Sequence, residues 1–360
     1  MTQAVHRIPV RAAGAAILLL TVFFLTAVHA EAAAAITAER LRLCLETLIP
    51  SLFGCMAASN LLIDSGAAAW LGARLTRLAR LLHLPPELLT VFLISQIAGY
   101  PVGTLLLCRM TAAQRLPKEA AGRFACICYG GGPAFLVGFA GARMFGSAPL
   151  GWMMLGGCML SNLLLLLLFP HSPAHDDFPA PAVRISADTL PRAVSGAMRS
   201  LCMICGMVLF FGQLMLLCDL TGITSALIRF GAGIGIPAQT VRALTAAISD
   251  VTQLPMLFSC GLSFRMLAAL SAALLSFGGL CVQLQCTALS GGIVRLRKLL
   301  LIRLAAACIT FLILYAAAGF FDDSDAVSVL AQPAAVSRTG SPIPAILIFC
   351  SGFPFLLKKD

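Results

Sequence analysis

The feature that most constrains this chain is a helix break in the middle of an apolar run. Residues 88–107 are mostly apolar, yet they contain the sequence Ala98-Gly99-Tyr100-Pro101-Val102-Gly103. Two glycines and a proline interrupt a helix and free backbone N–H and C=O groups that hydrocarbon cannot satisfy. Such a break persists only where it is buried in protein or lines a polar cavity, and transporters form binding sites at such breaks. We therefore expect the chain to be organised around residues 99–103.

The composition indicates a membrane protein. Hydrophobic residues make up 59% of the 360 residues and charged residues 11%, with a mean hydropathy of +0.95. Soluble domains carry roughly 25% charged residues, so most of this surface faces lipid. The net charge of +10 comes from short arginine clusters between apolar runs, which is the positive-inside pattern, and no basic stripe carries interleaved aromatic residues. We predict an all-α, multi-pass integral membrane protein that does not bind nucleic acid.

The cysteines and histidines do not predict a metal site. Most of the 14 cysteines lie in apolar runs, where they act as small packing residues. Cys126-x-Cys128 and Cys202-x-x-Cys205 lack the second pair or the nearby histidines that zinc sites use. The sequence also contains no G-x-S-x-G, H-E-x-x-H or P-loop motif. We expect no metal, no cofactor and no enzymatic activity.

The pattern of apolar runs divides the chain into five segments. The first apolar run, residues 12–28, is predicted to be a retained transmembrane helix, with a signal sequence cleaved after Ala30 as the alternative. The predicted segments are an N-terminal helix or signal anchor (1–40), a first repeat (41–169), a polar linker (170–198), a second repeat (199–321) and a partly apolar tail (322–360).

The charges around residues 88–107 predict a hairpin. The preceding stretch carries Arg74, Arg77 and Arg80 at the spacing of an amphipathic surface helix, and four basic residues follow between positions 109 and 123. If the run crossed the membrane once, one basic cluster would lie outside. A re-entrant hairpin that turns at residues 99–103 keeps both clusters on the cytoplasmic face.

A constant offset between landmarks predicts a duplicated architecture. Asp250 follows Tyr100 by 250 − 100 = 150 residues, Gly279 follows Gly130 by 149, and the run beginning at 299 follows the one beginning at 149 by 150. A fixed period of this kind is typical of a repeat. When the main basic loops are assigned to the cytoplasm, the two repeats are inverted, as in many secondary transporters.

Four ordered motifs between residues 40 and 320 resemble those of the sporulation integral membrane protein YlbJ family, which is built from nucleoside-recognition (Gate) domains. Residues 96–103 (QIAGYPVG) resemble its SGYPVG, and residues 128–135 (CYGGGPAF) lie where it has CNNSGPLF. Residues 144–147 (MFGS) match its following MFGS, and residues 276–285 (SFGGLCVQLQ) are similar to its SFGGLSVQLQ. Asp250-Val251-Thr252 occupies the acidic-Val/Ile-Thr position of the family.

The resemblance implies a fold like that of the concentrative nucleoside transporters, with paired re-entrant hairpins and interrupted helices. It also implies a role in sporulation, moving dipicolinic acid out of the mother cell across the outer forespore membrane. Two departures bear on the ligand. Tyr129 and Gly130 replace a pair of asparagines, and Asp250 replaces the more usual glutamate.

The predicted substrate-binding residues gather at the breaks and around one buried acid. Asp250 is the strongest candidate because ionisable groups within a bilayer are usually functional, the alternative being a loop-edge charge paired with Arg242 or Arg265. Arg143, Arg199 and Arg303 are candidate partners of an anion but are more typical of topology-setting charges. The full set is Gly99, Tyr100, Pro101, Gly103, Tyr129, Gly130, Gly131, Gly132, Pro133, Asp250, Thr252, Gln253, Gly278, Gly279, Gln283 and Gln285.

Two of these assignments leave a structural alternative open. Gln283 and Gln285 have amides that either bind a ligand or form hydrogen bonds between helices. Tyr100 either stacks on an aromatic ligand or anchors the hairpin at an interface.

We therefore expect a membrane transporter or facilitator for a small anionic aromatic metabolite, with dipicolinic acid as the leading substrate. A transporter of nucleosides or related small molecules is one alternative, and a non-transporting scaffold for sporulation proteins is another. The expected partners are the lipid bilayer and a small-molecule substrate, and the sequence leaves a homo-oligomer open. Proton or sodium coupling is left undecided, because export down a concentration gradient needs neither.

Overall fold

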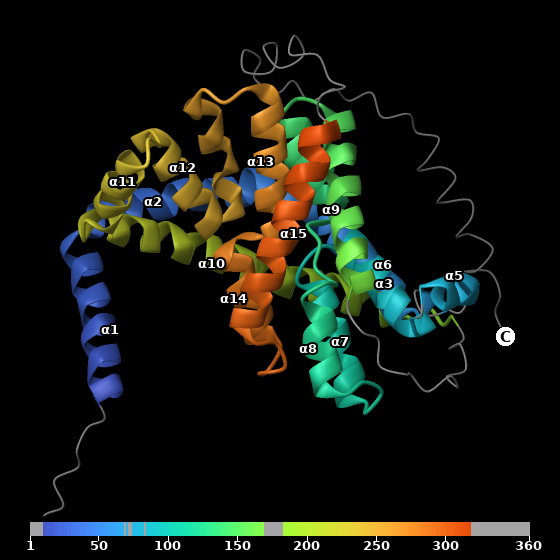
Figure 1. The fold of residues 1–360 in the computed structure, drawn as a ribbon. Coiled ribbons are helices and arrows are strands. Elements are labelled where there is room, and N and C mark those ends of the chain that lie inside the picture. The colour runs from blue at the N-terminus through green and yellow to red at the C-terminus, as the bar shows by residue number, and fades with distance from the viewer. Residues whose placement is uncertain (1–9, 68–69, 71–73, 83, 169–182, 318–360) are drawn as a thin grey trace, which may run out of the picture.

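The computed structural model describes residues 10–67, 70, 74–82, 84–168 and 183–317, and in this part of the chain every regular element is a helix (Figure 1). This confirms the predicted all-α class. The predicted C-terminal tail, the first nine residues and residues 170–182 of the predicted linker lie outside the described residues.

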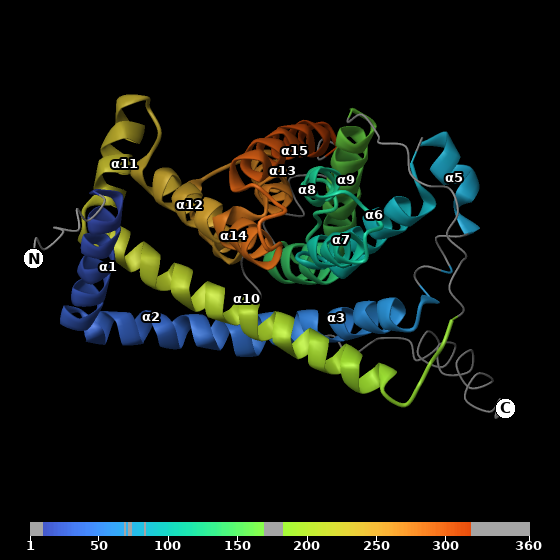
Figure 2. The same cartoon turned by 90° about the horizontal axis from the view of Figure 1, so that it is seen from below.

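Helices α1 (Val10–Val28), α2 (Ala30–Leu43), η1 (Cys44–Leu48) and α3 (Ile49–Asp64) form the N-terminal part. The chain bends by 92° between the end of α1 and the start of α2, so α1 turns away from the rod that α2, η1 and α3 form together (Figures 1 and 2). The predicted segment 41–63 is therefore the second part of a longer helical rod.

The rod packs along α10 (Thr189–Leu220). Gln213 of α10 donates from Nε2 to the Ala33 carbonyl at 2.7 Å and to Thr37 Oγ1 at 2.6 Å. Near the other end, Asn60 Nδ2 donates to the Ala193 carbonyl at 3.2 Å. Polar side chains thus link the rod to α10 near both of its ends.

The predicted linker ends too late. Helix α10 begins at Thr189, within the stretch 170–198 that its charges and prolines had suggested was a linker. Ala193 and Ala197 are fully buried, because their small side chains let α10 approach the N-terminal rod closely. Arg192, Ser195 and Arg199 lie on the exposed face of the same helix, which made the sequence look like a loop.

The predicted first hairpin is formed by α6 (Pro86–Ala98) and α7 (Val102–Ala112), which follow the short basic helix α5 (Thr76–Leu81). Glu87 at the start of α6 forms an ion pair with Arg115, just beyond the end of α7. The two ends of the segment therefore meet, and the chain turns at residues 99–101. The side of the membrane on which these ends lie stays a prediction.

A second pair of helices, α12 (Ala238–Ser249) and η3 (Val251–Cys260), follows α11 (Ile223–Gly233) and is packed together in the same way, with its turn at Asp250. The other two predicted breaks are also present. A coil at residues 126–133 separates α8 (Lys118–Ala125) from η2 (Ala134–Met144), and Gly278 separates α13 (Phe264–Phe277) from α14 (Gly279–Leu289). Breaks thus occur at both members of each predicted pair, while the inverted orientation stays a prediction.

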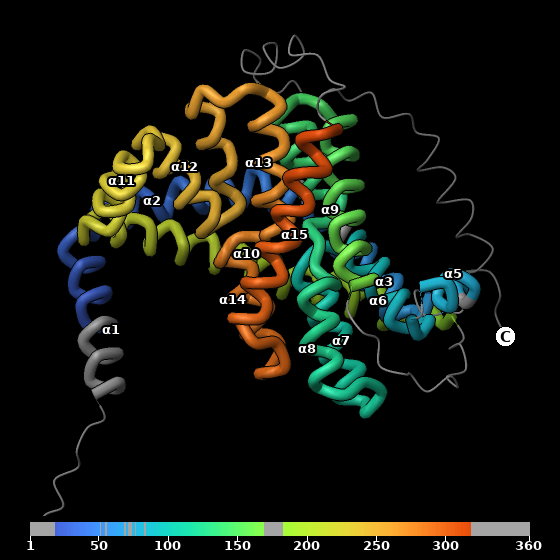
Figure 3. The backbone as a smooth tube through the Cα atoms, in the orientation of Figure 1, coloured from blue at the N-terminus to red at the C-terminus, as the bar shows by residue number. Residues whose placement is uncertain are grey.

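Helix α9 (Ala148–Leu168) and helix α15 (Leu296–Ala317) pack against α13 at the centre of the molecule (Figures 1 and 3). Gly157 lets α9 pack closely against α15, because a Cβ added there would lie 2.1 Å from a Leu314 methyl group of α15. Helices α7, α8 and α14 extend toward the same end of the molecule, below this centre in Figure 3.

In the described part of the chain, four segments are long and apolar enough to cross a membrane: α9, α10, α13 with α14, and α15. A fifth is added if the bent pair of α1 with α2 and η1 counts as one span. Several helices of this length and apolar character are typical of a multi-pass membrane protein, as the sequence predicts.

Candidate functional site

The turn of the first hairpin is built from residues that cannot continue a helix. Gly99 has φ +79°, a conformation that favours glycine, and it ends α6. The Tyr100–Pro101 peptide is cis, and Pro101 caps the start of α7. The turn packs tightly against the coil at residues 126–133, since a Cβ added at Gly99 would lie 3.2 Å from the Gly131 carbonyl oxygen.

The coil at residues 126–133 needs its glycines to fit against the first hairpin. A Cβ added at Gly130 would lie 3.0 Å from Gln96 Oε1, and one added at Gly132 would lie 2.9 Å from the Ile97 carbonyl oxygen. Gly103 of α7 faces the coil from the other side, where an added Cβ would be 2.1 Å from the Cys128 carbonyl oxygen. These glycines therefore allow two unwound segments to pack backbone against backbone.

Asp250 forms the turn of the second hairpin. Its backbone is extended, which ends α12, and its side chain caps η3: Oδ1 accepts from the Thr252 backbone N–H at 3.0 Å and Oδ2 accepts from Thr252 Oγ1 at 2.7 Å. Only 3% of the residue is exposed. Its local conformation is thus fixed by the capping bonds that an aspartate makes at the start of a helix.

Asp250 does not pair with either predicted arginine. Arg242 Nη1 instead donates to Asp219 Oδ2 at 3.2 Å. The Arg265 guanidinium lies 4.1 Å from the centre of the Tyr315 ring and donates to the carbonyl of that residue. The interpretation of Asp250 as a loop-edge charge paired with one of them is therefore wrong.

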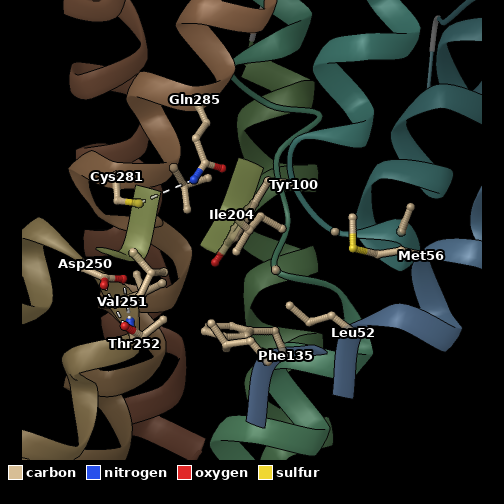
Figure 4. A pocket seen from close by; sticks show the side chains of 16 residues that line it. Leu52, Met56, Tyr100, Phe135, Ile204, Asp250, Val251, Thr252, Cys281 and Gln285 are labelled. Atoms are coloured by element: carbon tan, nitrogen blue, oxygen red, sulfur yellow. Dashed lines mark hydrogen bonds between the residues drawn. The ribbon is translucent and has the colours of Figure 1, made fainter. Parts of the chain in front are cut away.

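The turns of both hairpins line one pocket. Tyr100 comes from the first turn and Asp250 from the second, with Gly131, Thr252 and Gln285 contributing further polar groups. Figure 4 shows Asp250 and Thr252 on one side and Leu52 and Met56 on the other. The remaining walls come from Leu48, Ala98, Gly99, Phe135, Ile204, Val208, Val251, Cys281 and Val282.

The pocket combines apolar walls with a few polar groups. The empty space between its walls, including its open mouth, is about 540 Å³. Gln285 Nε2 lies 3.5 Å from Cys281 Sγ, a weak acceptor, and Thr252 Oγ1 receives a 3.3 Å contact from Gln253 Nε2. Asp250 is the one ionisable carboxylate among the described lining residues, which include no lysine, arginine or histidine.

Six of the predicted substrate-binding residues line this pocket: Gly99, Tyr100, Gly131, Asp250, Thr252 and Gln285. Ten others lie around it without lining it: Pro101, Gly103, Tyr129, Gly130, Gly132, Pro133, Gln253, Gly278, Gly279 and Gln283. Most of these shape the breaks. Gln283 is fully buried and donates from Nε2 to the Phe277 carbonyl at 3.0 Å, so it holds the α13–α14 break.

A buried polar network lies beside the breaks. Arg303 of α15 has no exposed surface and makes five hydrogen bonds, to Ser276, Asn162 and Cys126. Asn162 of α9 accepts from Arg303 Nη1 at 2.8 Å and donates from Nδ2 to Gln96 Oε1 and the Tyr129 carbonyl, each at 2.9 Å. The network joins the first hairpin, the coil at residues 126–133, the end of α13 before the Gly278 break, and the central helices α9 and α15.

This network corrects the interpretation of Arg303 as a topology-setting charge. An arginine that sets topology lies in a loop or at a helix end, whereas Arg303 is buried in the protein interior. Asn162 was not predicted at all. The available signal was the pair Ser161-Asn162 within the apolar run 149–169, because polar side chains inside a span require partners.

Tyr129 connects the network to the pocket. Its ring centre lies 4.7 Å from the Arg303 guanidinium carbon on one side and 5.0 Å from the Tyr100 ring centre on the other. The hydroxyl groups of Tyr100 and Tyr129 are both buried without a hydrogen-bond partner in the described structure. Tyr100, which lines the pocket, therefore keeps a free donor there.

The described residues contain no cluster of histidine, cysteine, aspartate or glutamate able to hold a metal ion. No protein-family model, curated protein or solved structure matches the chain.

Proposed function

We propose that this chain is an integral membrane transporter or facilitator that binds a small molecule between the turns of its two hairpins. The observation that carries the proposal is that Tyr100 and Asp250, each in a helix break, line the same pocket. Binding at interrupted helices is how many secondary transporters hold their substrates. A pocket lined from both halves also suits alternating access, since movement of one half against the other exposes it to each side in turn.

The lining favours a ligand with a flat apolar body and a few polar groups. Tyr100 and Phe135 offer aromatic surfaces, while Asp250, Thr252 and Gln285 offer hydrogen bonds. A small aromatic acid such as dipicolinic acid remains our leading substrate, with a nucleoside or related molecule as the second. An acid in contact with Asp250 would share a proton or a cation with it, because two bare carboxylates repel each other.

The sporulation role is part of the same proposal and rests on the resemblance of the motifs to the YlbJ family. On this proposal the protein lies in the outer forespore membrane and exports dipicolinic acid from the mother cell. A non-transporting scaffold for sporulation proteins is the competing proposal. The replacement of the paired asparagines by Tyr129 and Gly130 favours it, since loss of two amides removes polar contacts from a binding segment.

Flux through purified protein in liposomes tests the proposal, with radiolabelled dipicolinate and uridine as the two probes. Gln285→Ala removes a pocket-lining amide, whereas Gln283→Ala removes an amide from the same helix that does not line the pocket. We expect saturable flux of one probe, with the apparent KM raised about tenfold by Gln285→Ala and far less by Gln283→Ala.

Asp250→Asn distinguishes transport from scaffolding, because it removes the charge and keeps an oxygen for the Thr252 N–H bond. Transport predicts loss of flux and loss of cellular function at normal abundance and localisation. Full cellular function in Asp250→Asn, together with no flux of either probe through folded protein, would instead support the scaffold.

A further inference from the structure

Arg303 is a buried charge whose polar contacts are all neutral. Its hydrogen-bond acceptors are the carbonyls of Ser276 and Cys126, the Ser276 hydroxyl and the Asn162 amide oxygen. Among the residues that the structure describes, no carboxylate lies within ion-pair distance of it. The five bonds satisfy its N–H groups but leave its positive charge uncompensated.

An uncompensated charge in this position is costly and acts over a long range. Moving an ion out of water into the interior of a membrane protein is unfavourable even when its hydrogen bonds are made. The same absence of water leaves its field weakly screened, so it extends several ångströms further than that of a surface arginine. Exposed arginines such as Arg297, on the same helix, lack this property.

Two aromatic rings lie between Arg303 and the pocket. The guanidinium carbon lies 4.7 Å from the centre of the Tyr129 ring, which lies 5.0 Å from that of Tyr100. Tyr100 lines the pocket and its hydroxyl has no partner in the described structure. The Tyr100 side of the pocket therefore combines a free O–H donor with a nearby positive charge, which is a favourable setting for an anionic group.

We propose that Arg303 determines the charge selectivity of the pocket, by favouring the anionic group of a small organic acid on the Tyr100 side, away from Asp250. This inference rests on the proposed function, since it assigns a substrate class to the same pocket. Arg303 does not line the pocket and acts as a specificity-determining residue through its field. Asp250 at the other wall has the opposite charge and disfavours an anionic group there. We expect it to accept a hydrogen bond from a donor group, or from a bound proton, on the same ligand.

The test measures the potential in the pocket without any substrate. A single reporter cysteine is introduced by Ile204→Cys in a protein whose native cysteines are replaced, because Ile204 lines the pocket and is only half-buried. Its rates of reaction with an anionic and a cationic methanethiosulfonate, sulfonatoethyl and trimethylammonioethyl, are compared. The ratio of the two rates reports the local potential and cancels changes in accessibility that affect both reagents alike.

We expect Arg303→Gln to lower the anion-to-cation rate ratio by about tenfold or more, because a weakly screened charge changes the rates of the two reagents in opposite directions. Arg303→Lys keeps the charge while losing most of the hydrogen bonds, so it should keep the ratio within about twofold of the parent. Arg297→Gln removes an exposed arginine from the same helix and should also leave the ratio unchanged.

A second variant keeps the test decisive if Arg303→Gln does not fold. Asn162→Asp places a carboxylate where the amide oxygen now accepts from Arg303 Nη1 at 2.8 Å, which compensates the charge in place. It also loses the Nδ2 donor to Gln96 Oε1 and the Tyr129 carbonyl, so it is combined with Gln96→Glu as a protonatable partner only if the single variant does not fold. It should lower the ratio as Arg303→Gln does. An unchanged ratio in the folded variants overturns the charge assignment and leaves the pocket proposal intact. No reaction of the cysteine at position 204 with either reagent contradicts an open pocket, and with it both proposals.

Discussion

Glu87 and Arg115 form an ion pair although 28 residues separate them, because the helices between them turn back at residues 99–101. The legs of the hairpin have 13 and 11 residues, whereas a helix needs roughly 20 to cross a bilayer. The pair therefore holds together the two ends of a segment whose turn contributes Tyr100 to the pocket.

This relationship predicts that both ends of the first hairpin lie on one side of the membrane. Cysteines introduced singly by Leu78→Cys and Ala113→Cys should react with an impermeant maleimide only from the cytoplasmic side. Ala148→Cys, at the start of α9, serves as the control and should react only from outside in the predicted topology. Labelling of positions 78 and 113 from opposite sides would contradict the re-entrant hairpin and the inverted repeats together.

Charge reversal should measure the ion pair itself. Glu87→Lys and Arg115→Glu each place two like charges together, and the double variant restores an opposite pair. Since both side chains are about one third exposed, we expect a coupling free energy below about 1 kcal/mol in a double-mutant cycle of thermal unfolding in detergent. A double variant no more stable than the single variants would show that the pair contributes nothing to the hairpin.

The helix breaks could be predicted from sequence because glycine and proline act locally. Gly99 and Gly278 adopt positive φ angles, and Asp250 lies in extended backbone between two helices. The second set of breaks, at Asp250 and Gly278, could be predicted from local residues in the same way. The pocket-lining roles of Tyr100 and Asp250 follow from the position of each in a turn.

Other features depend on tertiary contacts that a linear pattern does not contain. Arg303 and Arg297 look alike in sequence, near the start of one apolar run, but only Arg303 faces the neighbouring helices and is buried. Gln283 and Gln285 lie two residues apart on α14 and therefore face different surroundings, so only Gln285 lines the pocket. The start of α10 was missed because its buried positions are alanines rather than large apolar residues.

Gly103 should tolerate no side chain. A Cβ there would lie 2.1 Å from the Cys128 carbonyl oxygen and 2.7 Å from Ser95 Cβ, and the backbone of an unwound segment cannot yield without disturbing the turn. We expect Gly103→Ala to destabilise the protein by about 3 kcal/mol or more, at or above the upper end of overpacking costs. Gly206→Ala on α10 is the matched control, since nothing lies within 4 Å of the added Cβ, and it should be neutral or stabilising. Equal melting temperatures of the two variants in detergent would contradict this packing.

Asn162 should be far more sensitive than its neighbour Ser161, although both are completely buried. Ser161 makes one hydrogen bond, from Oγ to the Ala306 carbonyl at 2.9 Å, so Ser161→Ala should cost about 1 kcal/mol. Asn162→Ala removes one acceptor of Arg303 and the donor to Gln96 Oε1 and the Tyr129 carbonyl. The buried guanidinium and these two oxygens each lose one hydrogen-bond partner. Breaking such a network costs about 3–5 kcal/mol. Thermal unfolding in detergent measures the difference, and a smaller loss in Asn162→Ala than in Ser161→Ala would show that Arg303 draws its support from Ser276 and Cys126 alone.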